Sequence, residues 1–164
     1  MGDWTVRPAR LEDLASLTWR LGQGRYFTDR LDRQSRGLGV LLTAWRAGVV
    51  LGVVYVWLEI AEEPEIRRHL PDTPLITHLE VHPQHRGEGI GRGLIGKAEE
   101  LLAREGHRSV ALAVEVNNGA AANLYKSLGF RNWRHGLINC YSLGDVNGHR
   151  RVEVCAVMTK SLTR

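Results

Sequence analysis

The fold is indicated by the stretch LEVHPQHRGEGIGRG, residues 79–93, in which alternating glycines join a short apolar strand to an amphipathic helix. Glycines let the backbone come close to a ligand, and the free N–H groups at the start of a helix bind anions. Arg86 and Arg92 add positive charge beside the glycines. The stretch therefore predicts a phosphate-binding loop that opens a helix.

The glycines can be compared with the patterns of three kinds of phosphate-binding loop. Residues 91–96 spell the dinucleotide fingerprint G-x-G-x-x-G, but that motif turns directly out of a strand, whereas Pro83 to Glu88 intervene here. Residues 91–98 nearly spell a nucleoside-triphosphate loop, but Ala98 stands where a magnesium-binding hydroxyl is required. The third pattern, Arg86-x-x-Gly89-x-Gly91, resembles the acetyl-CoA signature of the GNAT superfamily of N-acetyltransferases.

A second block, residues 118–130, is similar to the other GNAT signature, N-x-x-A-x-x-L-Y-x-x-x-G-F, at every defined position. Asn118 is a candidate helix N-cap, and Gly129 is a candidate C-terminal cap. Taken alone, the block is equally typical of a capped core helix with a Leu-Tyr stripe. Together with the upstream loop, it identifies the chain as resembling the GNAT superfamily.

The resemblance implies an α/β fold in one domain over residues 1–164. The expected architecture is a mixed, mostly antiparallel central sheet of six to seven strands, flanked by about four helices and splayed between the fourth and fifth strands. Periodicity and turn residues predict helices at 11–21, 91–105 and 119–128, a polar helical or irregular segment at 25–36, strands at 38–46, 49–59, 75–82, 109–116, 130–143 and 150–160, turns at 47–48 and 144–148, and a loop at 61–74.

The resemblance also implies a place for the cofactor. The pantetheine arm lies in the splayed gap, paired with backbone groups of Leu79 and Val81, while residues 86–92 hold the pyrophosphate and the following helix faces the cofactor. The implied cofactor-binding residues are Leu79, Val81, Arg86, Gly87, Gly89, Gly91, Arg92, Asn118 and Tyr125.

Acetyl transfer to an amine needs a proton source for the leaving thiolate and a proton acceptor for the amine. Tyr125 matches the family's proton donor. Glu80 is our candidate base with His78 as its neighbour, because the two share one face of a strand. A purely structural His-Glu pair is the alternative. Glu115 is the next candidate base, displaced by a residue or two from the acid of relatives that modify protein N-termini.

Composition narrows the class further. The chain has 164 residues, 43% hydrophobic content and a formal charge of +4, without a Lys/Arg run or a nucleic-acid motif, so we expect no nucleic-acid partner. No stretch approaches the roughly 20 apolar residues of a membrane span, which leads us to expect a cytoplasmic protein without a membrane partner. Cys140 and Cys155 lack metal-ligand spacing, so we expect reduced thiols and no metal.

The predicted function is transfer of an acetyl group from acetyl-CoA to a primary amine of a small molecule or peptide. A non-catalytic acyl-CoA-binding sensor or assembly module is the alternative, and a longer acyl donor stays open. The acidic loop residues Glu59, Glu62, Glu63, Glu65 and Asp72 form either a solvated loop or a rim that attracts a cationic amine. Trp19, Tyr26 and Phe27 are candidates to line an apolar acceptor pocket. Coenzyme A and the amine are the expected partners, and a homodimer is left open.

Overall fold

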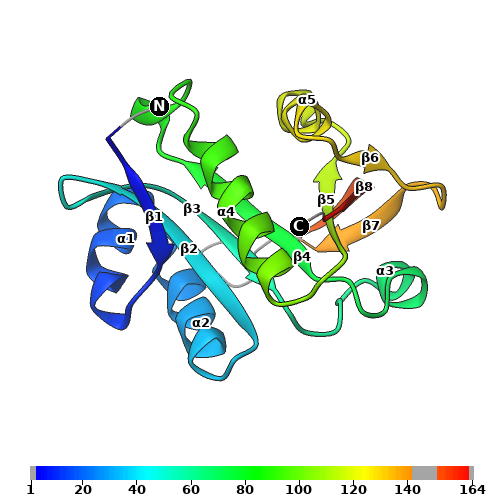
Figure 1. The fold of residues 1–164 in the computed structure, drawn as a ribbon, viewed down its shortest axis with the longest axis horizontal. Helices are drawn as coiled ribbons and strands as arrows, with labels where there is room; N and C mark the ends of the chain where they lie inside the picture. The colour runs from blue at the N-terminus through cyan, green and yellow to red at the C-terminus, as the bar shows by residue number, and fades with distance from the viewer. Residues whose placement is uncertain (1–2, 142–150, 163–164) are drawn as a thin grey trace.

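The computed structural model describes residues 3–141 and 151–162. These residues form one mixed sheet with helices on both of its faces (Figure 1). The elements are β1 (Thr5–Pro8), α1 (Leu14–Leu21), α2 (Gly24–Ser35), β2 (Gly39–Arg46), β3 (Val49–Trp57), α3 (Pro64–His69), β4 (Leu75–Val81), α4 (Ile90–Arg104), β5 (Ser109–Glu115), α5 (Gly119–Ser127), β6 (Arg131–Asn132), β7 (Ile138–Tyr141) and β8 (Val152–Ser161), with 3-10 turns at Leu11–Asp13 and Pro83–His85.

The strands lie in the order β1-β2-β3-β4-β5-β8-β6, and β7 also pairs with β8. In the described parts of the chain, β4 and β5 pair in parallel, and the other strand pairs are antiparallel. The expected α/β class, mostly antiparallel sheet and flanking helices are confirmed. The described residues contain eight strands and five α-helices, slightly more than expected, because β1 was not foreseen, the expected strand at 130–143 is divided into β6 and β7, and α3 forms within the expected loop.

Two cores form, one on each face of the sheet. One core contains apolar residues of α1, α2 and α3, including Leu17, Phe27 and Ile66. The other contains the apolar stripes of α4 and α5, including Leu94 and Tyr125. Alternation along the strands divides their side chains between these two cores, as expected for a sheet covered on both sides.

The central feature of the sheet is a divergence between β4 and β5. Within the described residues, their register contains one pair, Leu75 with Ala111, and the Ala111 N–H donates to the Pro74 carbonyl at 3.1 Å. By contrast, β5 pairs with β8 along its whole length from Ser109 to Glu115. The predicted splay between the fourth and fifth strands is therefore present.

A bulge lies in β4 next to this divergence. Two residues, His78 and Leu79, lie opposite the single residue Val54 of β3. His78 has a φ of 53°, in the left-handed region that non-glycine residues seldom adopt. One extra residue changes the face to which all following side chains point. Glu80 consequently points toward the α1–α2 connection, where Gln23 Nε2 donates to its Oε1 at 2.9 Å.

Secondary-structure expectations agree with the structure to within one or two residues for most elements. The main difference lies in the expected loop at 61–74, where α3 begins with Pro64 in its first turn and buries Ile66. Proline at that position suits a helix start, because its missing N–H needs no partner there. The predicted turn at 144–148 lies outside the described residues.

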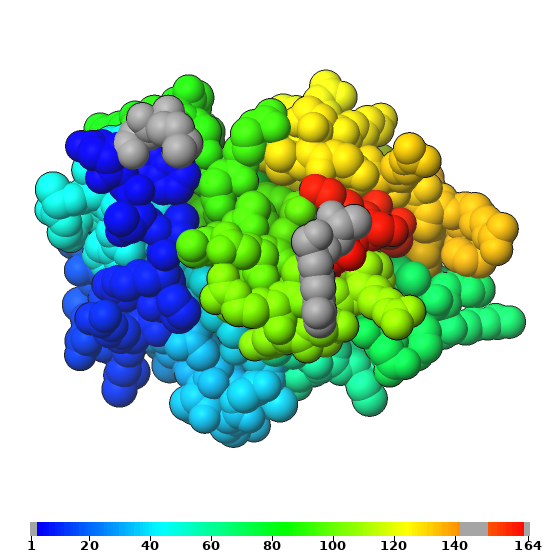
Figure 2. Space-filling model, in the orientation of Figure 1, coloured from blue at the N-terminus to red at the C-terminus, as the bar shows by residue number. Residues whose placement is uncertain are grey.

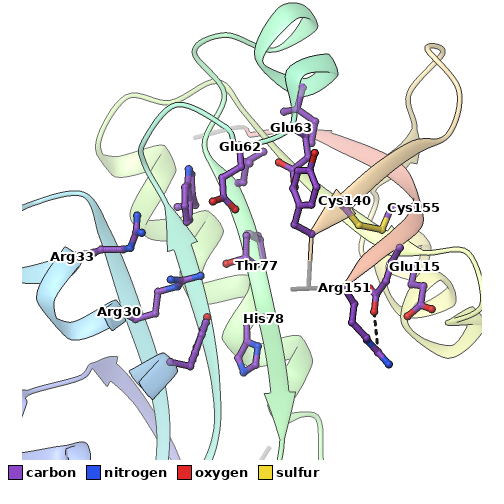
Figure 3. A pocket seen from close by; sticks show the side chains of 18 residues that line it. Arg30, Arg33, Glu62, Glu63, Thr77, His78, Glu115, Cys140, Arg151 and Cys155 are labelled. Carbon is purple, nitrogen blue, oxygen red and sulfur yellow. Dashed lines mark hydrogen bonds and ion pairs between the residues drawn. A yellow bond between two sulfur atoms is a disulfide. The ribbon is translucent and has the colours of Figure 1, made fainter. Parts of the chain in front are cut away.

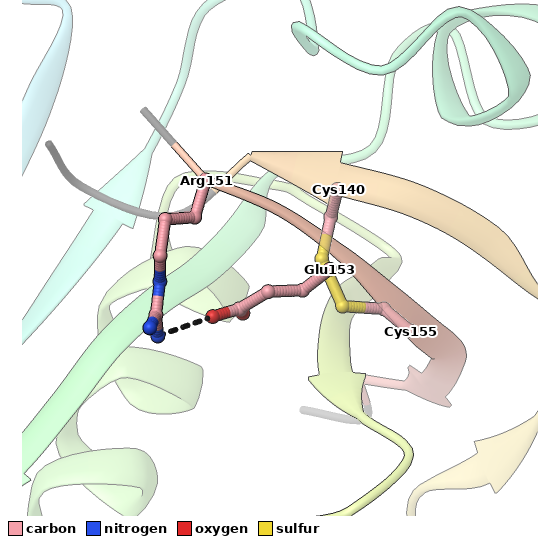
Figure 4. The surroundings of a disulfide bond; sticks show 4 residues. All are labelled: Cys140, Arg151, Glu153 and Cys155. Atoms are coloured by element: carbon pink, nitrogen blue, oxygen red, sulfur yellow. Dashed lines mark hydrogen bonds and ion pairs between the residues drawn. A yellow bond between two sulfur atoms is a disulfide. The ribbon is translucent and has the colours of Figure 1, made fainter. Parts of the chain in front are cut away.

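The expectation that Cys140 and Cys155 are reduced thiols is wrong, because the structure joins them in a disulfide (Figure 4). β7 and β8 pair with Cys140 opposite Glu153, which makes Cys155 its diagonal neighbour. The two Cα atoms are 6.2 Å apart, a separation that a disulfide spans. The sequence places the cysteines on separate strands, and only the pairing of those strands brings them together.

We expect Gly93→Ala to destabilise the fold by about 1–3 kcal/mol, since a Cβ at Gly93 would lie 2.1 Å from the Trp4 ring. The matched control is Gly96→Ala on the same helix, where nothing lies within 4 Å of the added atom. That change should stabilise the helix by about 0.5–1 kcal/mol. Urea unfolding measures both variants, and equal stabilities would show that Trp4 does not restrict Gly93.

Candidate active site

The predicted phosphate loop has the backbone that an anion site needs. Gly87 and Gly89 have φ angles of 81° and 83°, and Gly89 is the N-cap of the 15-residue helix α4. The turn before them is fixed by His82, whose side chain accepts a hydrogen bond from the Gln84 N–H at 3.1 Å. Left-handed glycines at a helix start turn successive N–H groups toward one point. This arrangement suits a pyrophosphate.

The two sequence motifs lie side by side in the folded chain. Arg92, in the first turn of α4, donates to the Ser127 hydroxyl of α5 at 3.1 Å. A Cβ at Gly91 would lie 3.6 Å from Leu79 of β4 and 3.8 Å from Leu124 of α5. Figure 2 shows the corresponding green and yellow surfaces next to each other. The start of α4 is thus held against α5, across the side of the sheet where β4 and β5 diverge.

Asn118 and Tyr125 occupy the positions expected from the second motif. Asn118 is the N-cap of α5, and its Oδ1 accepts a hydrogen bond from the Ala121 N–H at 3.1 Å. Tyr125 is 9% exposed and its ring makes an edge contact with Phe130, with 5.9 Å between centroids. Burial raises the pKa of the Tyr125 hydroxyl to about 12, so the phenol stays protonated near neutral pH.

His78 and Glu80 form a pair on the opposite face of β4. His78 Nε2 lies 3.0 Å from Glu80 Oε1, and the imidazole packs against the Tyr26 ring at 4.1 Å between centroids. Burial alone raises the pKa of Glu80, but hydrogen bonds from His78 and Gln23 outweigh it, so the pKa lies below its usual value. Glu80 is therefore a carboxylate near neutral pH. With Nε2–H donating to Glu80, Nδ1 of His78 is the nitrogen that accepts a proton.

The remaining predicted cofactor-binding residues are divided between the core and the surface. Leu79 and Val81 pack toward the core that contains α4, and Arg86 Nε donates to the Val81 carbonyl at 3.3 Å. Arg86 and Arg92 are exposed. Both guanidinium groups therefore border the start of α4, where they are accessible to a phosphate.

A cavity of about 820 Å³ opens on the face of the sheet that carries His78. Thr77 and His78 of β4 and Ala113 and Glu115 of β5 line it, so the cavity lies over the divergence of the two strands. Figure 3 shows Arg30 and Arg33 of α2 on one side and Glu115, Arg151 and the disulfide on the other. Glu80 does not line the cavity. His78 is the member of the pair that a ligand in the cavity would meet.

Of the residues expected to line an acceptor pocket, Tyr26 lines this cavity, whereas Trp19 and Phe27 do not, and the contribution of the α2 arginines was missed. Tyr26, Arg30 and Arg33 follow at intervals of four and three, which places them on one face of the helix. This spacing could have indicated a shared helix face, but the composition of the segment at 25–36 predicts only a polar stretch, either helical or irregular. The acidic rim was foreseen in part: Glu62 and Glu63 line the cavity, whereas Glu59 pairs with Arg33 at 2.6 Å.

Comparison with known proteins identifies the family. Residues 8–130 match the model of the acetyltransferase (GNAT) family. The chain belongs to this family. The resemblance inferred from the two motifs is therefore confirmed at the level of the family.

A mycothiol acetyltransferase from Kocuria rhizophila is 45% identical over 53 residues, which are 32% of this chain and 18% of that protein. The aligned region spans less than half the length of curated relatives such as this one. These partial matches show that the aligned part of the chain resembles acetyltransferases. They do not identify the acceptor.

Solved structures agree over nearly the whole chain. The ribosomal-protein-S18-alanine N-acetyltransferase of Escherichia coli has a TM-score of 0.72 at 17% identity, covering 98% of this chain and 95% of that one. A phosphinothricin acetyltransferase from Sinorhizobium meliloti, solved with acetyl-CoA, has a TM-score of 0.71 at 20% identity, covering 98% and 89%. These likenesses establish the fold. Among the described residues, no helix combines the length and apolar character of a membrane span.

We expect Gly91→Val to weaken acetyl-CoA binding by about 10-fold or more while the fold survives. Gly91 is inside α4, and its added Cβ would make ordinary contacts with Leu79 and Leu124, but the valine methyl groups extend into the meeting place of the two motifs. Calorimetry measures the affinity. Gly96→Val is the control, because the space around that Cβ is open; equal affinities for the two variants would contradict the site.

Proposed function

We propose that this chain transfers the acetyl group of acetyl-CoA to a primary amine of a small molecule or peptide by direct attack. The observation that supports the proposal is the contact between the two motifs, Arg92 with Ser127 at 3.1 Å, beside strands that diverge after a single pair. The contact joins the start of α4, which we propose binds the pyrophosphate, to α5, the helix that carries the buried Tyr125. The cavity lies over the divergence of the strands.

In this proposal the donor substrate lies along the gap between β4 and β5. The pyrophosphate is held by N–H groups at the start of α4 and by two arginines, and the pantetheine arm pairs with backbone groups of β4. The proposed binding residues are Leu79, Val81, Arg86, Gly87, Gly89, Gly91, Arg92, Asn118 and Tyr125.

The amine approaches from the cavity. Its nitrogen attacks the thioester carbonyl carbon, the C–S bond breaks, one amine proton leaves and the thiolate gains a proton. His78 lines the cavity and accepts the amine proton at Nδ1 in this proposal, while Glu80 accepts the Nε2–H hydrogen bond and orients the ring. The roles assigned from sequence are thus exchanged, because His78 lines the cavity and Glu80 does not.

Tyr125 supplies the thiolate proton in the same scheme. Its pKa of about 12 keeps the phenol protonated until it is needed, and the Tyr125 ring belongs to the core beneath the diverging strands.

Glu115 is a second candidate base, because it lines the cavity from β5. We also propose a cytoplasmic location, where acetyl-CoA is available; the disulfide is more typical of an oxidising compartment.

Release of the free thiol of coenzyme A tests the function directly. Wild-type protein is incubated with acetyl-CoA and panels of polyamines, aminoglycosides, amino acids and peptides, and mass gain identifies the acetylated acceptor. Acceptor-dependent thiol release supports an enzyme. Tight acetyl-CoA binding without release by any panel member would instead favour the non-catalytic sensor.

We expect Tyr125→Phe to slow turnover by about 10- to 1000-fold, the range in which losses of a general acid fall. Acetyl-CoA affinity should stay near the wild-type value, because the ring and its contact with Phe130 are kept. Steady-state turnover and calorimetry separate the two effects. Wild-type turnover in the variant would show that Tyr125 only packs and that water protonates the thiolate.

We expect His78→Ala and Glu80→Gln each to lower the rate by about 10- to 100-fold near neutral pH, with partial recovery at high pH, where free amine needs no base. A decrease in rate caused by protonation of Glu80 itself would occur below pH 4.5, because the pKa of Glu80 is lowered. His135→Ala, an exposed histidine outside the cavity, is the control. If both pH–rate profiles match the wild type, the base lies elsewhere, with Glu115 tested next.

A further inference from the structure

Three buried donors at or beside the Arg30 side chain have no hydrogen-bond partner in the part of the chain that the structure describes, and two of them belong to residues that line the cavity. They are Nε of Arg30 and the hydroxyl groups of Tyr26 and Tyr55. Tyr26 is 6% exposed and Tyr55 is fully buried. Buried polar atoms are paired in the great majority of proteins, because an unpaired one costs about 1–3 kcal/mol. An unpaired group of donors beside a cavity therefore suggests a ligand.

The Arg30 guanidinium is held in a fixed orientation by aromatic rings. Its Cζ lies 4.4 Å from the ring centroid of Tyr26, 5.0 Å from that of Tyr55 and 5.4 Å from that of Trp57. The Arg30 side chain is 14% exposed. Rings around a guanidinium stabilise it through cation–π attraction and restrict its rotation. Arg30 is thus positioned before any ligand arrives.

The neighbouring ion pairs leave Arg30 with spare donor capacity. Arg33 contacts two carboxylates, Asp29 at 2.7 Å and Glu59 at 2.6 Å. Among the described residues, Arg30 forms an ion pair with Asp29, and it shares that carboxylate with Arg33. Arg33 is therefore satisfied within the protein, whereas the Nε of Arg30 is not.

The chemistry of these donors selects the ligand group. A guanidinium has N–H donors and no acceptor, and its planar fork fits a carboxylate. Burial raises the pKa of both the Tyr26 and the Tyr55 hydroxyl, so these groups also stay donors near neutral pH. The missing partner is consequently an acceptor group, and an anionic carboxylate suits it best.

The remaining walls suit the amine end of the same molecule. Glu115 lines the cavity from β5, Glu62 and Glu63 line it from the loop before α3, and His78 lines it from β4 (Figure 3). Acidic groups attract an ammonium ion. Resting on the proposed function, we infer that the acceptor is a primary amine that also carries a carboxylate, an amino-acid-like molecule whose carboxylate binds Arg30 and Tyr26.

Matched acceptors test the inference. L-lysine is compared with cadaverine, and L-phenylalanine with phenethylamine, because each pair differs by the carboxylate alone. The measured quantity is kcat/KM for coenzyme A thiol release in wild type, Arg30→Met, Tyr26→Phe and Arg36→Met. Arg30→Met keeps an apolar stem against the rings, and Arg36→Met removes the same charge from an exposed position of the same helical region.

We expect wild-type protein to prefer at least one of the carboxylate-bearing acceptors by about 10- to 100-fold, as for hydrogen bonds to charged groups. Arg30→Met should lose this preference, Tyr26→Phe should lose part of it, and Arg36→Met should keep it. Acetylation of both members of each pair with equal efficiency, or an unchanged preference in Arg30→Met, would overturn the inference and leave the proposed function intact.

Two further measurements keep the outcomes separate. If Arg30→Met does not fold, the acceptor preference of Tyr26→Phe tests the inference instead. The stability of Tyr26→Phe should not fall, since this variant removes an unpaired buried hydroxyl. If no acceptor releases thiol, the proposed function fails. The inference is then decided by calorimetric titration of L-phenylalanine and L-lysine into CoA-saturated wild type and Tyr26→Phe, and binding that is absent or independent of the Tyr26 hydroxyl overturns it.

Discussion

The arrangement of this molecule depends on the single pair that joins β4 to β5. Leu75 and Ala111 hold the two strands together at one end, and beyond this pair β4 follows β3 while β5 follows β8. A buried strand normally pairs on both sides, because its backbone N–H and C=O groups need partners. Divergence leaves the facing edges of β4 and β5 available to an extended ligand. The same divergence separates the helices, so that α4 covers β4 and α5 follows β5.

The bulge at His78 makes the two sides of this gap chemically different. A regular strand would place His78 and Glu80 on the face of Ile76, which packs in the core with α4. The extra residue moves both side chains to the cavity face. A left-handed non-glycine residue costs about 1–3 kcal/mol, and the contacts of His78 with the Tyr26 ring and the Glu80 carboxylate offset that strain. Thus β4 presents apolar side chains to one core and the His78–Glu80 pair to the opposite face of the sheet, where His78 lines the cavity.

The half of the site that we propose binds the donor was predictable, because short-range features specify it. Glycine spacing predicted the left-handed turns at Gly87 and Gly89, and Asn118 was recognisable as an N-cap. The bulge at His78 was not predictable, since neither glycine nor proline marks it. The register of β4 against β3 alone reveals it. The disulfide likewise depends on how β7 pairs with β8, which the spacing of the cysteines does not determine.

The acceptor side of the site is built in a different way from the donor side. Its walls come from segments that are distant in sequence: Arg30 of α2 on one side, and the Cys140–Cys155 disulfide between β7 and β8 on the other. Neither wall contains a motif. The orientation of Arg30 comes from rings on α2 and β3, and the disulfide fixes β7 to β8 where both line the cavity. Substitutions in α2, or in the strands that carry the cysteines, can therefore change the acceptor without changing the glycine loop, and this separation explains why the sequence identifies the donor but not the amine.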